Sequence, residues 1–132
     1  MKPSGLGKRH KLCAKVAIDR LFDQKASGSF GALAYPLRAV WATNPGRQRG
    51  ASVQFLITIP KKRLRHAVDR VLMRRRVREA YRLARPYAVP DATEQPIDIA
   101  FIYISDKIEE YARVNRAMKK LLATIFPTDR QQ

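Results

Sequence analysis

Residues 53–85 read VQFLITIPKKRLRHAVDRVLMRRRVREAYRLAR, and this stretch decides the fold. Apolar and polar residues alternate from Val53 to Ile59, which predicts a strand with one buried face. From Lys61 to Arg85 the spacing becomes that of a helix with one apolar face and one arginine face. The apolar face contains Val68, Leu72, Met73, Val77, Ala80, Leu83 and Ala84. A strand that leads into an amphipathic helix indicates helices packed on a sheet.

The arginine face of this predicted helix is its most unusual feature. It contains Arg70, Arg74, Arg75, Arg78, Arg82 and Arg85. Four of these recur at every fourth position, so their guanidinium groups form one ridge with a spacing of about 6 Å. Like charges at this spacing oppose helix formation by about 0.3 kcal/mol per pair. Phosphates along a nucleic-acid backbone would neutralise them, because the guanidinium fork pairs with phosphate through two hydrogen bonds.

Two other interpretations of the helix remain open. Its basic face could simply be solvated, as charged helix faces usually are. It could also lie on a membrane surface, but such helices carry Trp, Phe or Leu bulk on the apolar face. Here that face is mostly Ala, Val and Met, which favours packing on a protein core.

The composition fits one folded, basic domain. The chain has 132 residues, with 27 Lys and Arg against 11 Asp and Glu, and a formal net charge of +16. Because 45% of the residues are hydrophobic, a purely disordered basic tail is excluded. The charge is uneven, since residues 61–86 carry a net +9 and residues 87–132 a net −1. We expect a single domain over 1–132, with flexible ends at 1–7 and 127–132.

Other classes of protein are disfavoured by what the sequence lacks. The single cysteine, Cys13, cannot form an internal disulfide, and with two histidines it cannot complete a zinc site. The residues after Met1 show no apolar run typical of a signal peptide or a membrane span. We therefore expect a soluble, cytoplasmic protein with no membrane partner and no metal of its own.

The remaining elements follow from periodicity and from turn residues. Helices are predicted over 8–24 and 107–126, and strands over 33–42 and 97–104. Pro36 lies inside the predicted strand 33–42, which suggests an edge strand or a bulge. The second helix should bury Tyr111, Val114, Met118, Leu121, Leu122 and Ile125. The order of helix, two or three strands, helix, strand and helix predicts a small α+β or α/β sandwich.

The predicted arginine helix and the residues just before it resemble those of a known family. The string Ala67-Val-Asp-Arg70 is followed by Arg74-Arg-Arg-Val-Arg78-Glu-Ala-Tyr-Arg82, directly after a strand and a Lys61-Lys-Arg63 cluster. This resembles the pattern of the bacterial ribonuclease P protein subunit, which runs Ala-Val-x-Arg-Asn-Arg, then basic residues and Arg-Glu-Ala. The chain departs from that pattern at Val71 and Leu72, which stand where the family has Asn and Arg. Contacts made by those two family residues cannot be carried over.

The resemblance implies a fold and a function. The fold would be α+β, with a small mixed four-stranded sheet, three helices and a left-handed strand-helix-strand crossover, as in the second domain of small-subunit ribosomal protein five. The protein would assist an endoribonuclease that removes the 5′ leader of precursor tRNA, while the RNA subunit holds the catalytic magnesium ions. The sequence agrees independently, because Asp69 and Glu79 are the only acids between residues 24 and 90. A nuclease site with clustered carboxylates on the protein is therefore disfavoured, and we predict no catalytic or metal-binding residues.

The resemblance also suggests two binding regions. The RNA subunit would contact the predicted arginine helix and its entry loop through Lys61, Lys62, Arg63, Arg65, Arg70, Arg74, Arg75, Arg78 and Arg82. The single-stranded leader would lie in a cleft between the first helix and the open sheet face, lined by Ile18, Phe22, Arg38, Gln54 and Thr58. Ile18 and Phe22 could equally be core residues. No obligate protein partner is evident.

Two further functional hypotheses compete with this one. A structural RNA-binding protein, such as a ribosomal component, would show the same arginine face and no role in catalysis. A metal-dependent nuclease would cleave RNA without any added RNA subunit.

Overall fold

The computed structural model describes residues 29–45, 52–90, 93 and 95–127. In chain order these contain β1 (Ser29–Ala34), β2 (Leu37–Thr43), β3 (Val53–Thr58), α2 (Ala67–Ala88), β4 (Ile97–Tyr103) and α3 (Tyr111–Ile125). The helix predicted over 8–24 lies outside the described residues. Every other predicted helix and strand has a counterpart.

The four strands form one mixed sheet in the order β1-β2-β4-β3. β1 pairs antiparallel with β2, and β2 pairs antiparallel with β4. β3 and β4 are parallel and start in register at Val53 and Ile97. Parallel neighbours need a long connection between them, and α2 supplies it. The predicted α+β fold with a mixed four-stranded sheet is therefore confirmed, while the hand of the β3-α2-β4 crossover stays a prediction.

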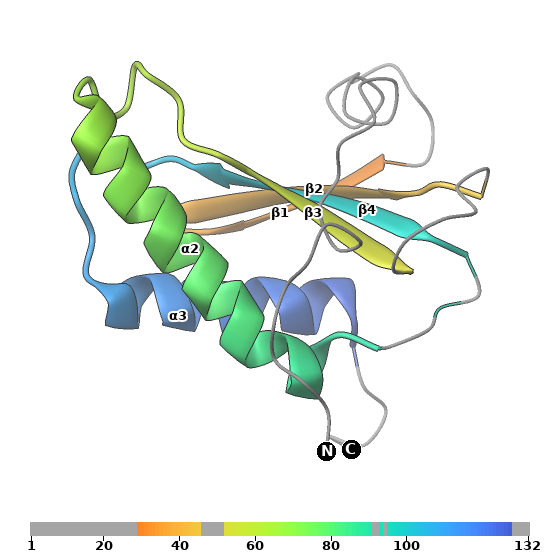
Figure 1. The fold of residues 1–132 in the computed structure, drawn as a ribbon. Coiled ribbons are helices and arrows are strands. Elements are labelled where there is room, and N and C mark those ends of the chain that lie inside the picture. Colours follow the sequence, from red (N-terminus) through yellow and green to blue (C-terminus); the bar gives the residue numbers. More distant parts are fainter. Residues whose placement is uncertain (1–28, 46–51, 91–92, 94, 128–132) are drawn as a thin grey trace.

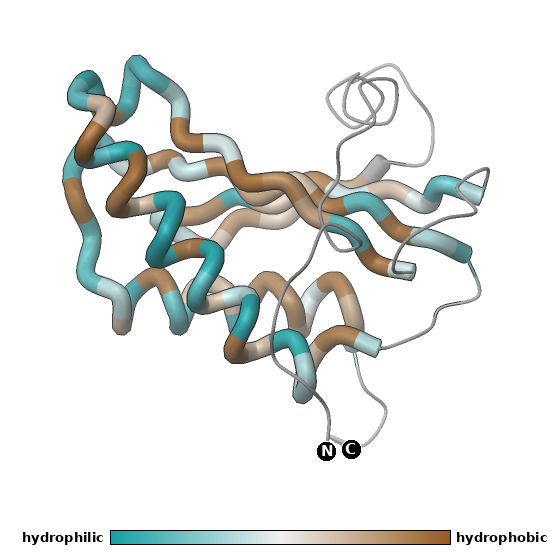
Figure 2. The backbone as a smooth tube through the Cα atoms, viewed as in Figure 1, coloured by the Kyte–Doolittle hydropathy of each residue, from teal (hydrophilic) through white to brown (hydrophobic). Residues whose placement is uncertain are grey.

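Both described helices lie on the same side of the sheet (Figure 1). Hydrophobic residues alternate with hydrophilic ones along α2 and form short uninterrupted runs in β3 and β4 (Figure 2). The core between the two layers is centred on Phe101 of β4, whose ring lies 5.6 Å from that of Tyr81. Tyr81 also contacts Phe55 of β3, with 4.4 Å between the ring centroids. These three rings join α2 to the two parallel strands.

The prediction of one strand over 33–42 is wrong. Residues 29–43 form a hairpin, in which Ala34 of β1 pairs with Leu37 of β2 across a tight turn at Tyr35 and Pro36. The Pro36 oxygen accepts a hydrogen bond from the main-chain N–H of Ile104, at 2.9 Å. A proline has no N–H for a strand ladder, so a turn between two strands accommodates it where a strand interior could not.

The arginine helix begins later and ends later than the predicted 61–85. Residues 60–64 form a turn, because the main-chain N–H groups of Arg63 and Leu64 both donate to the Pro60 oxygen. The turn buries the Leu64 side chain in the core. At the other end α2 continues through Pro86 to Ala88, although a proline inside a helix has no N–H for the i→i−4 hydrogen bond.

The buried face of α2 also differs from the predicted one. Met73, Val77, Ala80 and Ala84 are buried as expected, whereas Val68 and Leu83 are exposed. Leu72 is partly buried. Tyr81 and Arg85 take part in the buried stripe instead. The buried face is rotated around the helix axis relative to the predicted one, because α2 packs against both the sheet and α3.

The last helix begins at Tyr111 rather than at residue 107. Side chains from the end of β4 hold the preceding residues as a turn: the Ser105 hydroxyl accepts the N–H of Lys107, and the Tyr103 hydroxyl donates to the Lys107 oxygen. The predicted inward face of the helix is confirmed. Val114, Met118, Leu121 and Leu122 are buried, and Tyr111 and Ile125 pack partly buried against them.

A buried carboxylate, Glu109, ties the elements together at this turn. It accepts hydrogen bonds from the Ser105 hydroxyl at 2.7 Å and from Arg113 of α3 at 2.9 Å. Its main-chain oxygen accepts a hydrogen bond from Arg76 of α2. Tyr35 of the hairpin turn donates to the same carboxylate at 3.4 Å. The Ser105 hydrogen bond, with the Arg113 pair as the next favourable contribution, lowers the pKa of Glu109 below the ordinary 4.5.

This lowered pKa predicts how stability depends on pH. A carboxyl whose pKa is lower in the folded state stabilises the fold above its unfolded pKa, and loses that contribution as the pH falls through its folded pKa. We expect Glu109→Gln to lower the free energy of unfolding at pH 7 by about 1–2 kcal/mol. It should also flatten the decline in stability below about pH 4.5. Urea unfolding measured from pH 7 down to pH 3 tests both effects. Glu110→Gln, a change at the adjacent exposed carboxylate, is the matched control, and an equal effect there would contradict the prediction.

Candidate nucleic-acid interface

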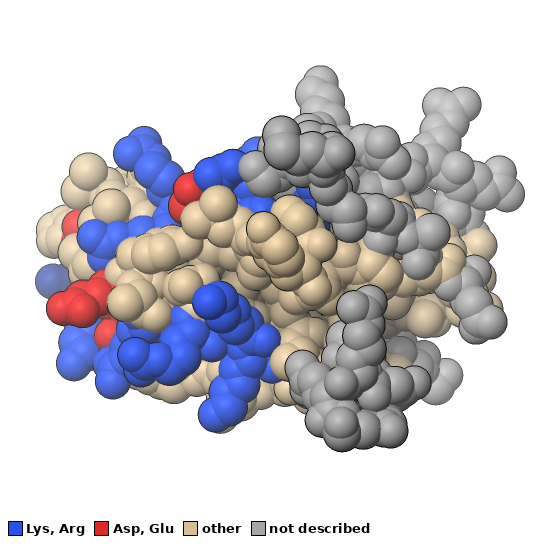
Figure 3. Space-filling view, turned by 90° about the horizontal axis from the view of Figure 1, so that it is seen from below, with Lys and Arg blue, Asp and Glu red and all other residues tan. Residues whose placement is uncertain are grey.

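Three arginines of α2 are exposed together on the side of the helix that faces β3. They are Arg74, Arg75 and Arg78, and we call them the arginine patch. Viewed from the helical side, basic side chains gather at the end of the molecule where α2 begins, and only a few acidic side chains lie among them (Figure 3). Such a surface attracts anions along a path of several residues rather than at a point.

Arg70, which the sequence predicts to contact RNA, forms hydrogen bonds within the protein. Its guanidinium Nη1 donates to the main-chain oxygens of Leu64 and Arg65, both at 2.9 Å. These two carbonyls belong to the loop that enters α2. Arg70 therefore holds the entry loop against the first turn of the helix, and its side chain is half-buried.

Arg82, the last member of the predicted ridge, is paired with Glu79. Its Nε and Nη2 atoms donate to the two carboxylate oxygens of Glu79 at 2.8 and 2.7 Å. This hydrogen-bonded fork lowers the pKa of Glu79 and raises that of Arg82. The pair reduces the net charge that this turn of the helix offers to an anion.

The entry loop, which contains Lys61–Arg65 and leads into α2, adds positive charge next to the start of that helix. Lys61, Lys62 and Arg65 are exposed. Arg63 is partly buried and forms an ion pair with Asp106 at 3.1 Å. Among the predicted RNA-contacting residues, Arg63, Arg70 and Arg82 therefore have well-defined contacts within the protein. The cations of the arginine patch are exposed, as are Lys61, Lys62 and Arg65.

A groove lies directly beside the arginine patch, between β3 and α2. Its volume is about 350 Å³, and its lining consists of Phe55, Leu56, Ile57, Val71, Arg74, Arg75 and Arg78. We call it the β3–α2 groove. Among the described residues, its lining combines apolar side chains with three cations and contains no acidic residue.

The opposite face of the sheet carries the described residues of the predicted leader cleft. Arg38 of β2 is in register with Ile102 of β4, which is in register with Thr58 of β3. Cross-strand neighbours point to the same face, so Arg38 and Thr58 share the face that α2 and α3 leave uncovered.

Gln54, the third described residue of the predicted cleft, lies on the same face but is buried. Its register partner Asp98 is also buried and accepts a hydrogen bond from the Asn44 side chain at 2.9 Å. An acid therefore lies next to the predicted leader site, which sequence reasoning had not included. Ile18 and Phe22, which the sequence predicts for the other wall of this cleft, lie outside the described residues.

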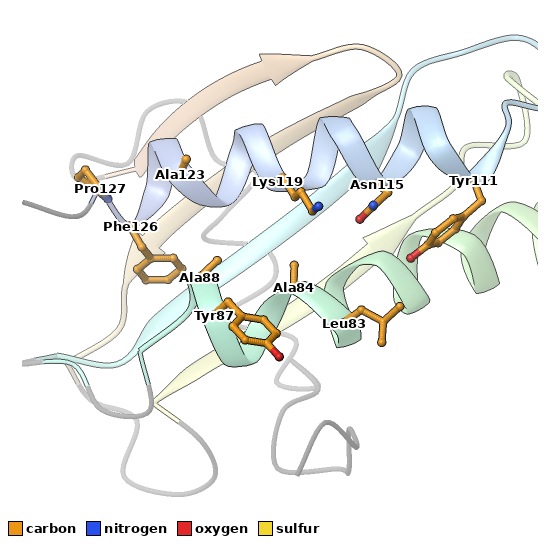
Figure 4. Close-up of a pocket in the computed structure, with 10 residues that line it drawn as sticks. All are labelled: Leu83, Ala84, Tyr87, Ala88, Tyr111, Asn115, Lys119, Ala123, Phe126 and Pro127. Atoms are coloured by element: carbon orange, nitrogen blue, oxygen red, sulfur yellow. The ribbon is translucent and has the colours of Figure 1, made fainter. Parts of the chain in front are cut away.

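A second groove lies between α2 and α3, with a volume of about 660 Å³. Leu83 and Tyr87 of α2 and Tyr111 and Lys119 of α3 line it, and Phe126 lies at one end (Figure 4). Of the described residues in its lining, only Lys119 is charged. This larger groove is therefore separate from the surface that could bind a polyanion.

Residues with metal-binding or membrane-spanning character do not gather in the described part of the chain. No group of three or more His, Cys, Asp or Glu side chains that could hold a metal ion occurs among those residues. No helix there is both long and apolar enough to cross a membrane.

Sequence reasoning missed two features of the interface. Arg85, assigned to the arginine face, is buried at 8% exposure. The β3–α2 groove was also not predicted, although one signal pointed to it. Val71 is an apolar residue within the arginine arc, and it lies in the lining of the groove.

Comparison with known proteins gives consistent results. The family model described as "Ribonuclease P" matches residues 6–125. A curated "Ribonuclease P protein component" from Porphyromonas gingivalis strain ATCC 33277 is 35% identical over 123 residues, which are 92% of this chain and 86% of that protein. The counterpart from strain W83 matches with the same identity and coverage.

Solved structures resemble the fold. The Staphylococcus aureus RNase P protein superposes with a TM-score of 0.67 at 14% identity, covering 88% of this chain and 94% of that one. The Thermotoga maritima RNase P protein gives 0.66 at 17% identity, covering 86% and 96%. At these identities the likeness concerns the fold alone.

Proposed function

Because this chain belongs to the ribonuclease P protein component family, we propose that it binds the catalytic RNA subunit of ribonuclease P through the arginine patch and the entry loop. On the same premise, the open sheet face receives the single-stranded 5′ leader of precursor tRNA. Family membership supports a role as a subunit of the ribonucleoprotein that processes tRNA.

The observation that carries the proposal is the exposed cluster of cations on α2. Arg74, Arg75 and Arg78 lie close together, and Lys61 and Lys62 extend the positive surface along the entry loop. Each arginine that pairs with a phosphate displaces condensed counterions, so binding gains free energy as the salt concentration falls. Guanidinium pairs with phosphate also fix orientation, because two hydrogen bonds form in one plane.

The leader would be held on the other face of the sheet. Arg38 would supply a cation for its phosphates and Thr58 a polar contact, whereas Gln54 is buried on the same face. Ile18 and Phe22 of the predicted first helix would form the opposite wall, where a ring can stack on a base with little sequence preference.

In this assignment the chemistry belongs to the RNA subunit. That subunit would hold the magnesium ions, and the described side chains of this protein would bind and orient RNA without touching the reacting phosphate. We place the assembly in the cytoplasm and assign it no obligate protein partner.

The test is leader removal from precursor tRNA at low magnesium concentration. A bacterial ribonuclease P RNA together with this protein is expected to cleave at least tenfold faster than the RNA alone, since improved binding of substrate and ions shows most when magnesium is limiting. The protein without RNA is the control and should not cleave. Binding without any stimulation would instead support a purely structural RNA-binding protein, and cleavage by the protein alone would indicate a nuclease in its own right.

A further inference from the structure

The β3–α2 groove has a composition that the proposed phosphate contacts do not explain. Arginines that bind phosphates need only an exposed surface, yet here they border a recess with an apolar floor. Val71, which lines this recess, is 49% exposed. A single half-exposed apolar residue is ordinary on a protein surface. Inside a recess lined by arginines, however, it offers a planar apolar group a surface to cover.

The shape of the groove follows from the strand that forms its floor. Phe55, Leu56 and Ile57 are consecutive in β3, and their side chains alternate between the two faces of the sheet. All three can line one groove only if the groove runs along the edge of the strand. β3 is an outer strand of the sheet, paired with β4 alone among the described strands. Main-chain donors and acceptors on its outer edge therefore border the groove.

Charge and size both restrict what could occupy such a groove. Three guanidinium groups are among the described residues that line it, and they favour an anion. The volume of about 350 Å³ lies near the lower end of the range for small-ligand sites, about 300–1,000 Å³. A single nucleotide meets both conditions, because it joins a planar ring to a phosphate. Arginine side chains also stack on exposed bases, and unpaired bases are the usual targets of protein recognition in RNA.

We propose that the β3–α2 groove receives one unpaired base of the RNA, with its ring against Val71 and its flanking phosphates on the arginine patch. This inference rests on the proposed function and adds a specific contact to it. The base lies against the apolar floor, and its polar edge meets the outer edge of β3. The groove thus selects a bulged or looped nucleotide rather than a continuous duplex.

The test replaces Val71 in the full-length protein with a larger side chain that fills the groove. The affinity of each variant for a bacterial ribonuclease P RNA is then measured. Val71→Trp is expected to lower the affinity about tenfold, the loss typical of one base contact. The slope of affinity against salt should stay unchanged, because no cation is removed. Val71→Ala, which keeps the helix and removes part of the contact, should lower the affinity about threefold. Val68→Trp is the matched control, since Val68 is an exposed valine of the same helix that does not line the groove.

A second measurement identifies the base. Chemical probing of unpaired adenines and cytosines should reveal a base that wild-type protein and Val68→Trp protect and Val71→Trp does not. Removing that base from the RNA should then weaken the wild-type complex and have no further effect on the Val71→Trp complex. Thermal unfolding of each variant verifies that it is folded.

The outcomes separate this inference from the proposed function. If Val71→Trp and Val71→Ala bind RNA and protect bases as the wild type does, the groove does not hold a base, and an occupant such as a peptide strand along β3 would be favoured. The proposed function would still stand on salt-dependent binding and stimulation of cleavage. If the wild-type protein shows neither, the proposed function itself fails.

Discussion

Replacing Arg74, Arg75 and Arg78 together with glutamine is expected to weaken binding to the ribonuclease P RNA by about a thousandfold near physiological salt. Each arginine that neutralises a phosphate contributes about one unit to the slope of log affinity against log salt concentration. The triple variant should therefore reduce that slope by about three. Titrations at several salt concentrations measure the affinity and the slope on the same samples.

A control with the same change in charge separates a local contact from general attraction. Arg116, Lys119 and Lys120 are three exposed cations of α3. Changing them to glutamine removes three positive charges from the other helix and lowers the net charge of +16 by the same amount. This variant should lose less than tenfold in affinity. If the two triple variants lose affinity equally, the arginine patch is not the contact surface and only the total charge matters.

Replacing Phe101 with alanine is expected to lower the free energy of unfolding by about 4 kcal/mol. Phe101 is fully buried in β4, the strand that pairs with both β2 and β3. Its loss opens a cavity beneath Tyr81, and neighbours fixed in three elements cannot collapse to fill it. Small domains are stable by about 5–15 kcal/mol, so a large share of the total is removed.

Urea unfolding at pH 7 measures this change, and Phe30→Ala provides the comparison. Phe30 of β1 is 59% exposed and stacks on Trp41 with 6.1 Å between the ring centroids. Its removal should cost about 1 kcal/mol, the value of one aromatic contact near the surface. The dependence of stability on urea should be similar for both variants if each unfolds in one step. A loss below about 2 kcal/mol for Phe101→Ala would mean that the core repacks around the vacancy.

Much of the fold could be predicted because its signals are local. The alternation in β3, the apolar run of β4 and the inward face of α3 each arise from side-chain periodicity within one element. The mixed sheet followed from a resemblance carried by residues 67–82. Errors occurred where a contact distant in sequence overrides the local pattern. One error concerns Pro36, whose main-chain oxygen accepts a hydrogen bond from the N–H of Ile104. Another concerns the start of α2, because the preceding Leu64 is buried in the core.

By itself the sequence determined that this protein has an amphipathic arginine helix after a strand, a strongly uneven positive charge and the residue pattern of the ribonuclease P protein family. Only the tertiary structure decided which arginines face outward. Arg70 binds the carbonyls of the entry loop, Arg82 pairs with Glu79, and Arg85 is buried, whereas Arg74, Arg75 and Arg78 border the β3–α2 groove. The physical reason is that helical periodicity sets the angle between side chains on one helix. What each side chain meets depends on the strands and loops that pack around that helix.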